Sequence, residues 1–192
     1  MDDRPPDGAT PIDPDESDAL IPAHIATHAE LNAWEQANIV AAEQWAFARR
    51  HGDCLRMEFV FELHRQMFAD TWRWAGKART TGKNVGVPAS EIRPELAKLI
   101  ADAHLWIDAS AYSPDEIAAR FHHRLVQIHA FPNGNGRHAR LLTDLLLSQL
   151  GRPRFSWGRE TLDSAGSARE RYLAALKDAD RGSLKALMAF AR

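Results

Sequence analysis

Residues 129–140, His-Ala-Phe-Pro-Asn-Gly-Asn-Gly-Arg-His-Ala-Arg, constrain this chain of 192 residues more than any other segment. They place a histidine, a Gly-Asn-Gly turn and two arginines three positions apart directly before residues 141–150, an apolar run that reads as a helix. Gly134 and Gly136 allow the backbone to take a positive φ or to approach a ligand closely. The sequence therefore predicts a tight turn that opens a buried helix, with backbone N–H groups and the positive end of the helix dipole facing a ligand.

The residue types in this turn are those of a phosphate site with a base beside it. Arg137 and Arg140 lie three apart, so they share a helix face and can hold phosphate oxygens through paired hydrogen bonds. His129 can reach the same anion as a proton acceptor. A Walker A loop is excluded because no Gly-Lys-Ser/Thr sequence follows the turn. The plainer alternative is a glycine turn with surface arginines and a structural histidine. Under this alternative, the spacing of these residues would be a coincidence.

The same segment resembles the Fic motif, H-x-F-x-(D/E)-G-N-G-R-x-x-R, of enzymes that move AMP from ATP onto hydroxyl side chains of proteins. Seven defined positions match, and they are His129, Phe131, Gly134, Asn135, Gly136, Arg137 and Arg140. Residues 74–79 resemble the segment before the family's β-hairpin flap, and residues 171–176 resemble its C-terminal helix. The resemblance covers about residues 56–192, with residues 27–50 as an additional N-terminal helix. Residues 21–22, 30–32 and 36–39 also resemble a Fic subgroup labelled mobile mystery protein B.

The resemblance implies a mainly α fold, a Fic-like helical bundle with a central buried helix and a small β-hairpin flap. It implies ATP as the substrate, Mg²⁺ as the metal, and His129 as the base that takes the proton of the target hydroxyl. Gly134, Asn135 and Gly136 then form the nest for the α- and β-phosphates, while Arg137 and Arg140 bind the outer phosphates.

Asn133 departs from the family's pattern because it occupies the acidic position of the motif. In the family an Asp or Glu there helps to hold Mg²⁺. An amide oxygen can still coordinate, but it lacks the negative charge that makes carboxylates good magnesium ligands. We therefore expect weak metal binding at Asn133, with the triphosphate supplying most of the coordination.

One short segment, residues 79–90, has the pattern of β-structure. Its glycines and the alternating pair Val85 and Val87 are typical of a short edge strand rather than a central one. In the family this segment is the flap, which binds the target by strand addition. The residues expected to dock the target are Lys83, Asn84, Val85, Gly86 and Val87. A plain connecting loop is the alternative.

Fic proteins often carry a regulatory helix with the pattern (S/T)-x-x-x-E-(G/N). The glutamate of this helix pairs with the arginine that would otherwise bind the γ-phosphate. Glu30 is the nearest candidate for an autoinhibitory residue, although Ala26 and Leu31 fail the two flanking positions. A capping box between Thr27 and Glu30 explains the same residues without regulation, and the sequence favours it.

The remaining composition indicates one domain, over residues 23–192, preceded by an acidic, proline-rich tail. Residues 1–22 hold seven acidic residues, one basic residue and five prolines, a composition that does not fold alone. A net charge of -2 gives no reason to expect nucleic-acid binding. We expect no membrane partner, because there is no long apolar run or signal-peptide pattern, and the single Cys54 suits the cytoplasm.

The expected activity is transfer of AMP from ATP to a Ser, Thr or Tyr hydroxyl of a target protein, with release of pyrophosphate. A small antitoxin-like or regulatory partner is also compatible with the family. Two alternatives within enzymes stay open, removal of AMP from a protein and transfer of another phosphate-containing group. Outside enzymes, the chain would be a nucleotide-sensing or partner-binding module. A zinc site that combines His129 with other histidines is disfavoured because no H-E-x-x-H spacing is present.

Overall fold

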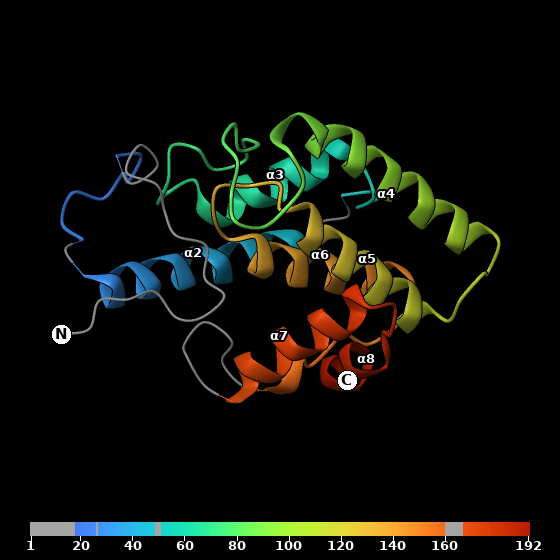
Figure 1. Ribbon diagram of the computed structural model, residues 1–192. Coiled ribbons are helices and arrows are strands. Elements are labelled where there is room, and N and C mark those ends of the chain that lie inside the picture. Colours follow the sequence, from blue (N-terminus) through green and yellow to red (C-terminus); the bar gives the residue numbers. More distant parts are fainter. Residues whose placement is uncertain (1–17, 26, 49–50, 160–166) are drawn as a thin grey trace.

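The computed structural model describes residues 18–25, 27–48, 51–159 and 167–192, and these residues are mainly helical (Figure 1). The α-helices are α2 (His28–Ala48), α3 (Met57–Phe68), α4 (Ile92–Asp108), α5 (Pro114–Ile128), α6 (Asn135–Gln149), α7 (Ser167–Asp180) and α8 (Lys185–Ala191). Two single-turn 3₁₀ helices, η1 (Ala89–Glu91) and η2 (Trp157–Arg159), complete the regular structure. The mainly α fold expected from the sequence is confirmed.

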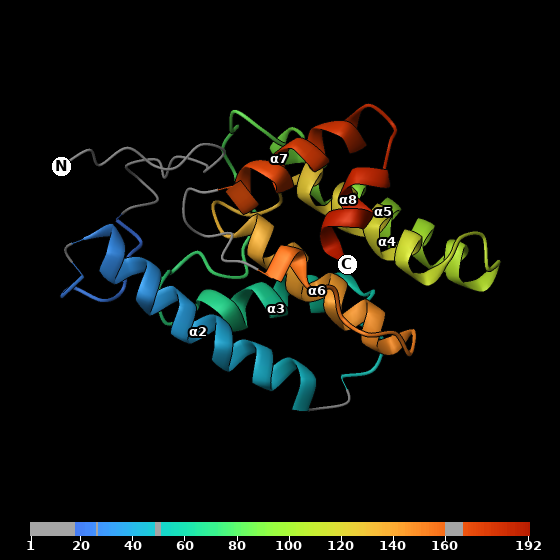
Figure 2. The same ribbon diagram turned by 90° about the horizontal axis from the view of Figure 1, so that it is seen from below.

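Helix α6 forms the centre of the bundle. It packs against α2, α3 and α5, and Figures 1 and 2 show it between the α2–α3 pair and the α4, α5, α7 and α8 group. Ten of its residues are buried, among them Thr143 and Asp144. A helix that is apolar most of the way round can only be stable when neighbours cover every side, and the position of α6 meets that requirement.

Helix α5 delivers the chain to the motif, and its start is encoded locally. The Ser113 hydroxyl accepts a hydrogen bond from the N–H of Glu116 at 3.3 Å, and Pro114 occupies the first helical position. The helix ends at Ile128, and residues 129–134 form the turn into α6. The serine cap and the proline therefore define where α5 begins, and the turn that carries the motif follows its end.

Helices α7 and α8 form a second buried cluster around Trp157, Tyr172 and Leu187 at one end of the bundle. Helix α8 begins at Lys185 with Leu184 in the capping position and without a side-chain hydrogen bond, so Ser183 does not cap it. Ser167 is the first residue of α7.

The N-terminal segment is tied to the domain by backbone pairing. Leu20 forms an isolated antiparallel bridge with Trp72, and the N–H of Ile21 donates to the carbonyl of Thr71 at 2.8 Å. Residues 1–17, most of the expected acidic tail, lie outside the described residues. No helix among the residues described is both long enough and apolar enough to cross a membrane.

The β-hairpin expected over residues 79–90 is not present. The isolated bridge between Leu20 and Trp72 is the only β-pairing within the described ranges. The backbone groups that a hairpin would pair are used elsewhere. The N–H of Arg79 donates to the carbonyl of Ala130, and the N–H of Val87 faces the carbonyl of Ile128 at 3.4 Å. An isolated two-stranded hairpin is only marginally stable in water. The segment is instead attached to the end of α5 by these hydrogen bonds.

Candidate active site

His129 lies at the point where α5 ends, in a backbone conformation that is rare for residues other than glycine. Its φ is 53°, in the left-handed region, and it forms the C-terminal cap of the helix. The side chain is buried. Burial lowers the pKa of His129 to about 4, with smaller contributions from the positive charges of Arg79 and Lys83. The imidazole is therefore neutral at pH 7 and can accept a proton.

Arg79 holds the backbone around His129, a role that the sequence did not reveal. Its Nε donates to the carbonyl oxygen of His129 at 2.6 Å, and its Nη1 donates to that of Thr81 at 2.9 Å. Its Nη2 donates to the carbonyl of Val87. The guanidinium is buried, so these bonds fix both ends of residues 79–87 to the turn that carries His129.

Gly86 passes directly over His129. Its φ is +99°, and a Cβ atom at this position would lie 2.6 Å from the Cβ of His129 and 2.7 Å from Nη2 of Arg79. Only glycine allows this conformation and this close approach together. Of the expected flap residues, Gly86 is therefore next to His129, and Val85 beside it is 48% exposed.

Asn135 closes the motif turn with its side chain. Its Oδ1 accepts from the N–H of Phe131 at 2.9 Å, and its Nδ2 donates to the carbonyl of Phe131 at 2.8 Å. The side chain thus clasps the loop, and the backbone N–H groups at the start of α6 remain as the candidate anion donors. Gly134 adopts a φ of 77° with its backbone against the ring of Phe68, where a Cβ would come within 2.5 Å.

Asn133 directs its amide oxygen inward rather than away from the loop. Its Oδ1 accepts a hydrogen bond from the N–H of Gly134 at 2.6 Å. The oxygen expected to be a weak magnesium ligand therefore already has one protein donor in this conformation.

His64 supports the same loop from the core, and it is a second residue that the sequence did not reveal. The N–H of Gly76 donates to its Nδ1 at 3.0 Å, so Nε2 carries the proton and faces the carbonyl of Asn133 at 3.1 Å. The ring stacks on Phe131 with centroids 3.7 Å apart. Complete burial lowers the pKa of His64 well below its usual value, which keeps the imidazole neutral.

Arg137 is held by the additional N-terminal helix. Its Nη1 lies 2.7 Å from Oε2 of Glu35, whose other oxygen accepts from the indole N–H of Trp72 at 2.6 Å. The side chains of Arg137 and Glu35 are only 16% and 4% exposed. Arg137 also lies over the ring of Phe68. A candidate phosphate-binding arginine is thus paired with a carboxylate of α2.

Glu30, the glutamate proposed from the sequence as autoinhibitory, lies in the first turn of α2. The N–H of Thr27 donates to Oε2 of Glu30 at 3.0 Å, and the N–H of Glu30 donates to the Thr27 hydroxyl at 3.2 Å. These reciprocal bonds are the capping box that the sequence favoured. The carboxylate of α2 that is seen to pair with a motif arginine is that of Glu35.

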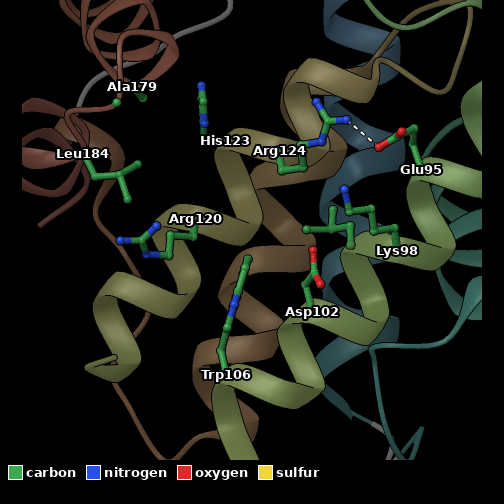
Figure 3. A pocket seen from close by; sticks show the side chains of 11 residues that line it. Glu95, Lys98, Asp102, Trp106, Arg120, His123, Arg124, Ala179 and Leu184 are labelled. Carbon is green, nitrogen blue, oxygen red and sulfur yellow. Dashed lines mark hydrogen bonds and ion pairs between the residues drawn. The ribbon is translucent and has the colours of Figure 1, made fainter. Parts of the chain in front are cut away.

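A separate cavity of about 300 Å³ lies between α4, α5 and the end of α7 (Figure 3). Its walls carry charges of both signs, and Arg124 pairs with Glu95 at 2.5 Å. Trp106 lies at the lower end of the labelled lining side chains in Figure 3. None of the motif residues lines this cavity.

The histidines near the motif are used by hydrogen bonds rather than gathered around a metal. His138 bonds through Nε2 to the carbonyl of Val60 at 2.9 Å, and His122 bonds to the hydroxyl of Tyr172 at 2.8 Å. In the described part of the chain, no three His, Cys, Asp or Glu side chains are grouped so that they could hold a metal ion.

Fold and site together define a helical domain built around a glycine-containing turn that opens α6, with a neutral histidine beside it. Residues 54–147 match the model of the Fic/DOC family. The protein adenylyltransferase fic-1 of Caenorhabditis briggsae is 35% identical over 137 residues, which are 68% of this chain and 25% of that protein. The chain carries a Fic domain and belongs to the Fic/DOC family.

Solved structures agree in fold. The N-terminal Fic domain of a VirB-translocated Bep effector protein from Bartonella quintana superimposes with a TM-score of 0.73 at 18% identity, covering 91% of this chain and 90% of that one. BepC of Bartonella tribocorum, solved with bound AMPPNP, gives a TM-score of 0.69 at 19% identity, with 91% and 94% coverage. The chain spans about a quarter of the length of the curated protein adenylyltransferases that it matches.

Proposed function

We propose that this protein is an adenylyltransferase that moves AMP from ATP to a Ser, Thr or Tyr hydroxyl of a target protein. The observation that carries the proposal is the neutral, buried His129 in the turn that leads into the N-terminus of α6. Relatives named as protein adenylyltransferases support it, as does BepC, which was solved with a nucleotide analogue.

In this reaction the target hydroxyl attacks the α-phosphorus of ATP. One P–O bond forms to the target, and the bond to the bridging oxygen of pyrophosphate breaks. His129 takes the hydroxyl proton as the new bond forms, which typically contributes about 10²–10⁴-fold. The backbone N–H groups of Asn135 and Gly136, together with Arg137 and Arg140, stabilise the charge that develops on the leaving pyrophosphate. The N–H of Gly134, which the sequence also assigned to the phosphates, donates instead to Oδ1 of Asn133.

The protein offers a poor set of ligands for the Mg²⁺ that normally accompanies ATP. Asn133 is the one candidate ligand in the motif, and its amide oxygen already accepts from Gly134. We therefore assign the coordination of Mg²⁺ to the triphosphate and derive no step of the reaction from a protein-bound metal.

Labelled ATP tests the proposed function. Incubation with a lysate and Mg²⁺ should place α-³²P label on protein, and γ-³²P label should stay with pyrophosphate. γ-Label on protein would instead indicate phosphorylation, and loss of label from a pre-adenylylated protein would indicate AMP removal. Tight ATP binding without transfer would favour the nucleotide-sensing or partner-binding module.

Asn133→Asp should lower the Mg²⁺ concentration needed for half-maximal labelling. The substitution adds a carboxylate next to the phosphate-binding turn, and carboxylates bind magnesium better than amides. A Mg²⁺ titration of labelling in both proteins measures the effect. Asn32→Asp, an equal change of charge on an exposed residue of α2, is the control. Identical titration curves for wild type and Asn133→Asp would show that position 133 does not contact the metal.

We also propose that Glu35 restrains Arg137, so that α2 competes with ATP for this arginine. Glu35→Gln keeps an amide oxygen for the indole N–H of Trp72 but removes the charge that pairs with Arg137. ATP affinity and self-labelling should then rise about fivefold or more, the usual size of coupling between two sites.

Glu43→Gln is the matched control for this prediction, because Glu43 also lies on α2 and pairs with an arginine outside the motif, Arg154, at 2.6 Å. Labelling by this variant should stay at the wild-type level. Reduced labelling by Glu35→Gln would show that Glu35 orients Arg137 for catalysis rather than restraining it.

The partners follow from the same proposal. The target protein docks along residues 83–87, of which Val85 is exposed and Gly86 covers His129. We place the reaction in the cytoplasm, because the single cysteine, Cys54, is a buried free thiol. A small antitoxin-like partner would act by the same competition for Arg137 as Glu35.

A further inference from the structure

The cavity between α4, α5 and the end of α7 is lined by side chains from all three elements. Helix α4 contributes Lys98, Asp102 and Trp106, which are four positions apart and so share one face of the helix. The turn after α7 contributes Gly182 and Leu184. At about 300 Å³ the cavity lies at the lower end of the range for ligand pockets. It therefore has room for one small molecule.

The basic side chains that α5 presents to this cavity already have carboxylate partners. Three such pairs are formed, Arg124 with Glu95 at 2.5 Å, Arg120 with Glu116 at 2.7 Å and His123 with Asp180 at 2.8 Å. These basic groups are thus balanced within the protein. A multiply charged anion such as a nucleotide would also lie against the carboxylates of Glu95 and Asp102, and like charges repel. The walls of the cavity therefore disfavour a phosphate ligand.

Lys98 and Asp102 differ from these pairs, because neither forms a hydrogen bond or ion pair within the part of the chain that the structure describes. In Figure 3 the dashed contact among the lining side chains joins Arg124 to Glu95 and involves neither of them. The two lie about one helical turn apart with the cation first, an order that gives a weaker pair than the reverse. One positive and one negative group therefore line the same cavity without being paired to each other.

We propose that this cavity binds a free amino acid with an apolar side chain. Its carboxylate pairs with Lys98 and its ammonium group with Asp102, because one zwitterion satisfies both charges at once. Side chains four positions apart on a helix have Cβ atoms only ~5–6 Å apart, which suits the two neighbouring charges of an amino acid. The apolar side chain of the ligand then packs on Trp106, about one turn further along α4, and on Leu184. This site is separate from the motif and from the proposed transfer of AMP.

Titration of the full chain with L-leucine and with L-phenylalanine, followed by NMR, tests the proposal. At least one of them should shift the indole N–H signal of Trp106, which is assigned by its loss in Trp106→Phe, and should raise the melting temperature. Glycine, which lacks an apolar side chain, should bind more weakly. Absence of binding by both amino acids, or binding that leaves the Trp106 signal unmoved, would overturn the proposal. The titration needs no ATP, so its result is independent of the proposed function.

Two analogues of the amino acid that binds more tightly test the zwitterion. The amide lacks the carboxylate and the des-amino acid lacks the ammonium group, so each should bind the wild type roughly tenfold more weakly, in line with loss of a hydrogen bond to a charged group. In Lys98→Gln the amino acid should bind no more tightly than its amide, and in Asp102→Asn no more tightly than the des-amino acid. Equal affinity of the wild type for the amino acid and either analogue would contradict the assignment.

Asp108→Asn is the matched control, because Asp108 is an exposed carboxylate of α4 that does not line the cavity. This variant should bind the amino acid like the wild type. If Asp102→Asn binds it as tightly as Asp108→Asn does, Asp102 does not hold the ammonium group and the proposal fails. Tighter binding of the N-acetylated amide, which has neither charge and resembles a residue within a peptide chain, would also decide against a site for a free amino acid.

Discussion

His129→Ala should abolish AMP transfer while ATP affinity stays within a few-fold of wild type. A general base acts on the transition state much more than on the bound ground state, so the loss should appear in kcat and reach about 10²–10⁴-fold. Single-turnover labelling measures the transfer step, and titration calorimetry with ATP measures binding. Transfer at a near wild-type rate would show that His129 is not the base.

His123→Ala is the control for this prediction, because His123 lies on the same helix and bonds to Asp180 at the surface, away from the motif. The pH profile of the wild type gives a second check. The pKa of His129 is lowered to about 4, so the neutral, accepting form persists well below pH 6.5. The rate should fall only as the pH drops toward 4, the range in which the imidazole becomes protonated.

The sequence predicted the parts of this site that depend on local pattern. The buried helix after the motif and the capping box at Thr27 both follow from residues within one or two turns of each other. In each case the chemistry of the cap or of the apolar face allows few other solutions. Local information was sufficient there.

The residues that the sequence missed act over long separations. Arg79 bonds to His129 across 50 positions, and His64 bonds to Asn133 across 69. Glu35 meets Arg137 only because α2 packs against α6. No spacing rule connects such pairs, so a single sequence gives no indication that they are in contact. The burial of Glu35 on α2 is likewise seen only in the structure.

The missing hairpin has the same origin. The alternation of Val85 and Val87 is a true strand pattern, but a strand needs a partner with free backbone groups. Here the buried guanidinium of Arg79 donates hydrogen bonds to carbonyl groups within residues 79–87 and so holds this segment at the end of α5. A tertiary contact that is invisible in the local pattern therefore decides the conformation of this segment.

Gly86→Ala should reduce AMP transfer about 10²-fold, the cost expected when a reacting group is displaced by roughly 1 Å. The added Cβ would come within 2.6 Å of the Cβ of His129 and 2.7 Å of Nη2 of Arg79, and Arg79 is fixed by its bonds to the surrounding carbonyls. Neither neighbour can move without shifting the turn that carries His129. The φ of +99° at this position adds backbone strain for any residue with a side chain.

Gly82→Ala provides the matched control, because a Cβ at Gly82 would meet no atom within 4 Å. Labelling by this variant should equal that of the wild type, and both variants should bind ATP, since neither glycine belongs to the turn that opens α6. Transfer and ATP affinity measured on one preparation of each protein separate misplacement of His129 from a general loss of folding. If Gly86→Ala transfers AMP as fast as Gly82→Ala, then residues 79–87 do not hold His129 in its reactive position.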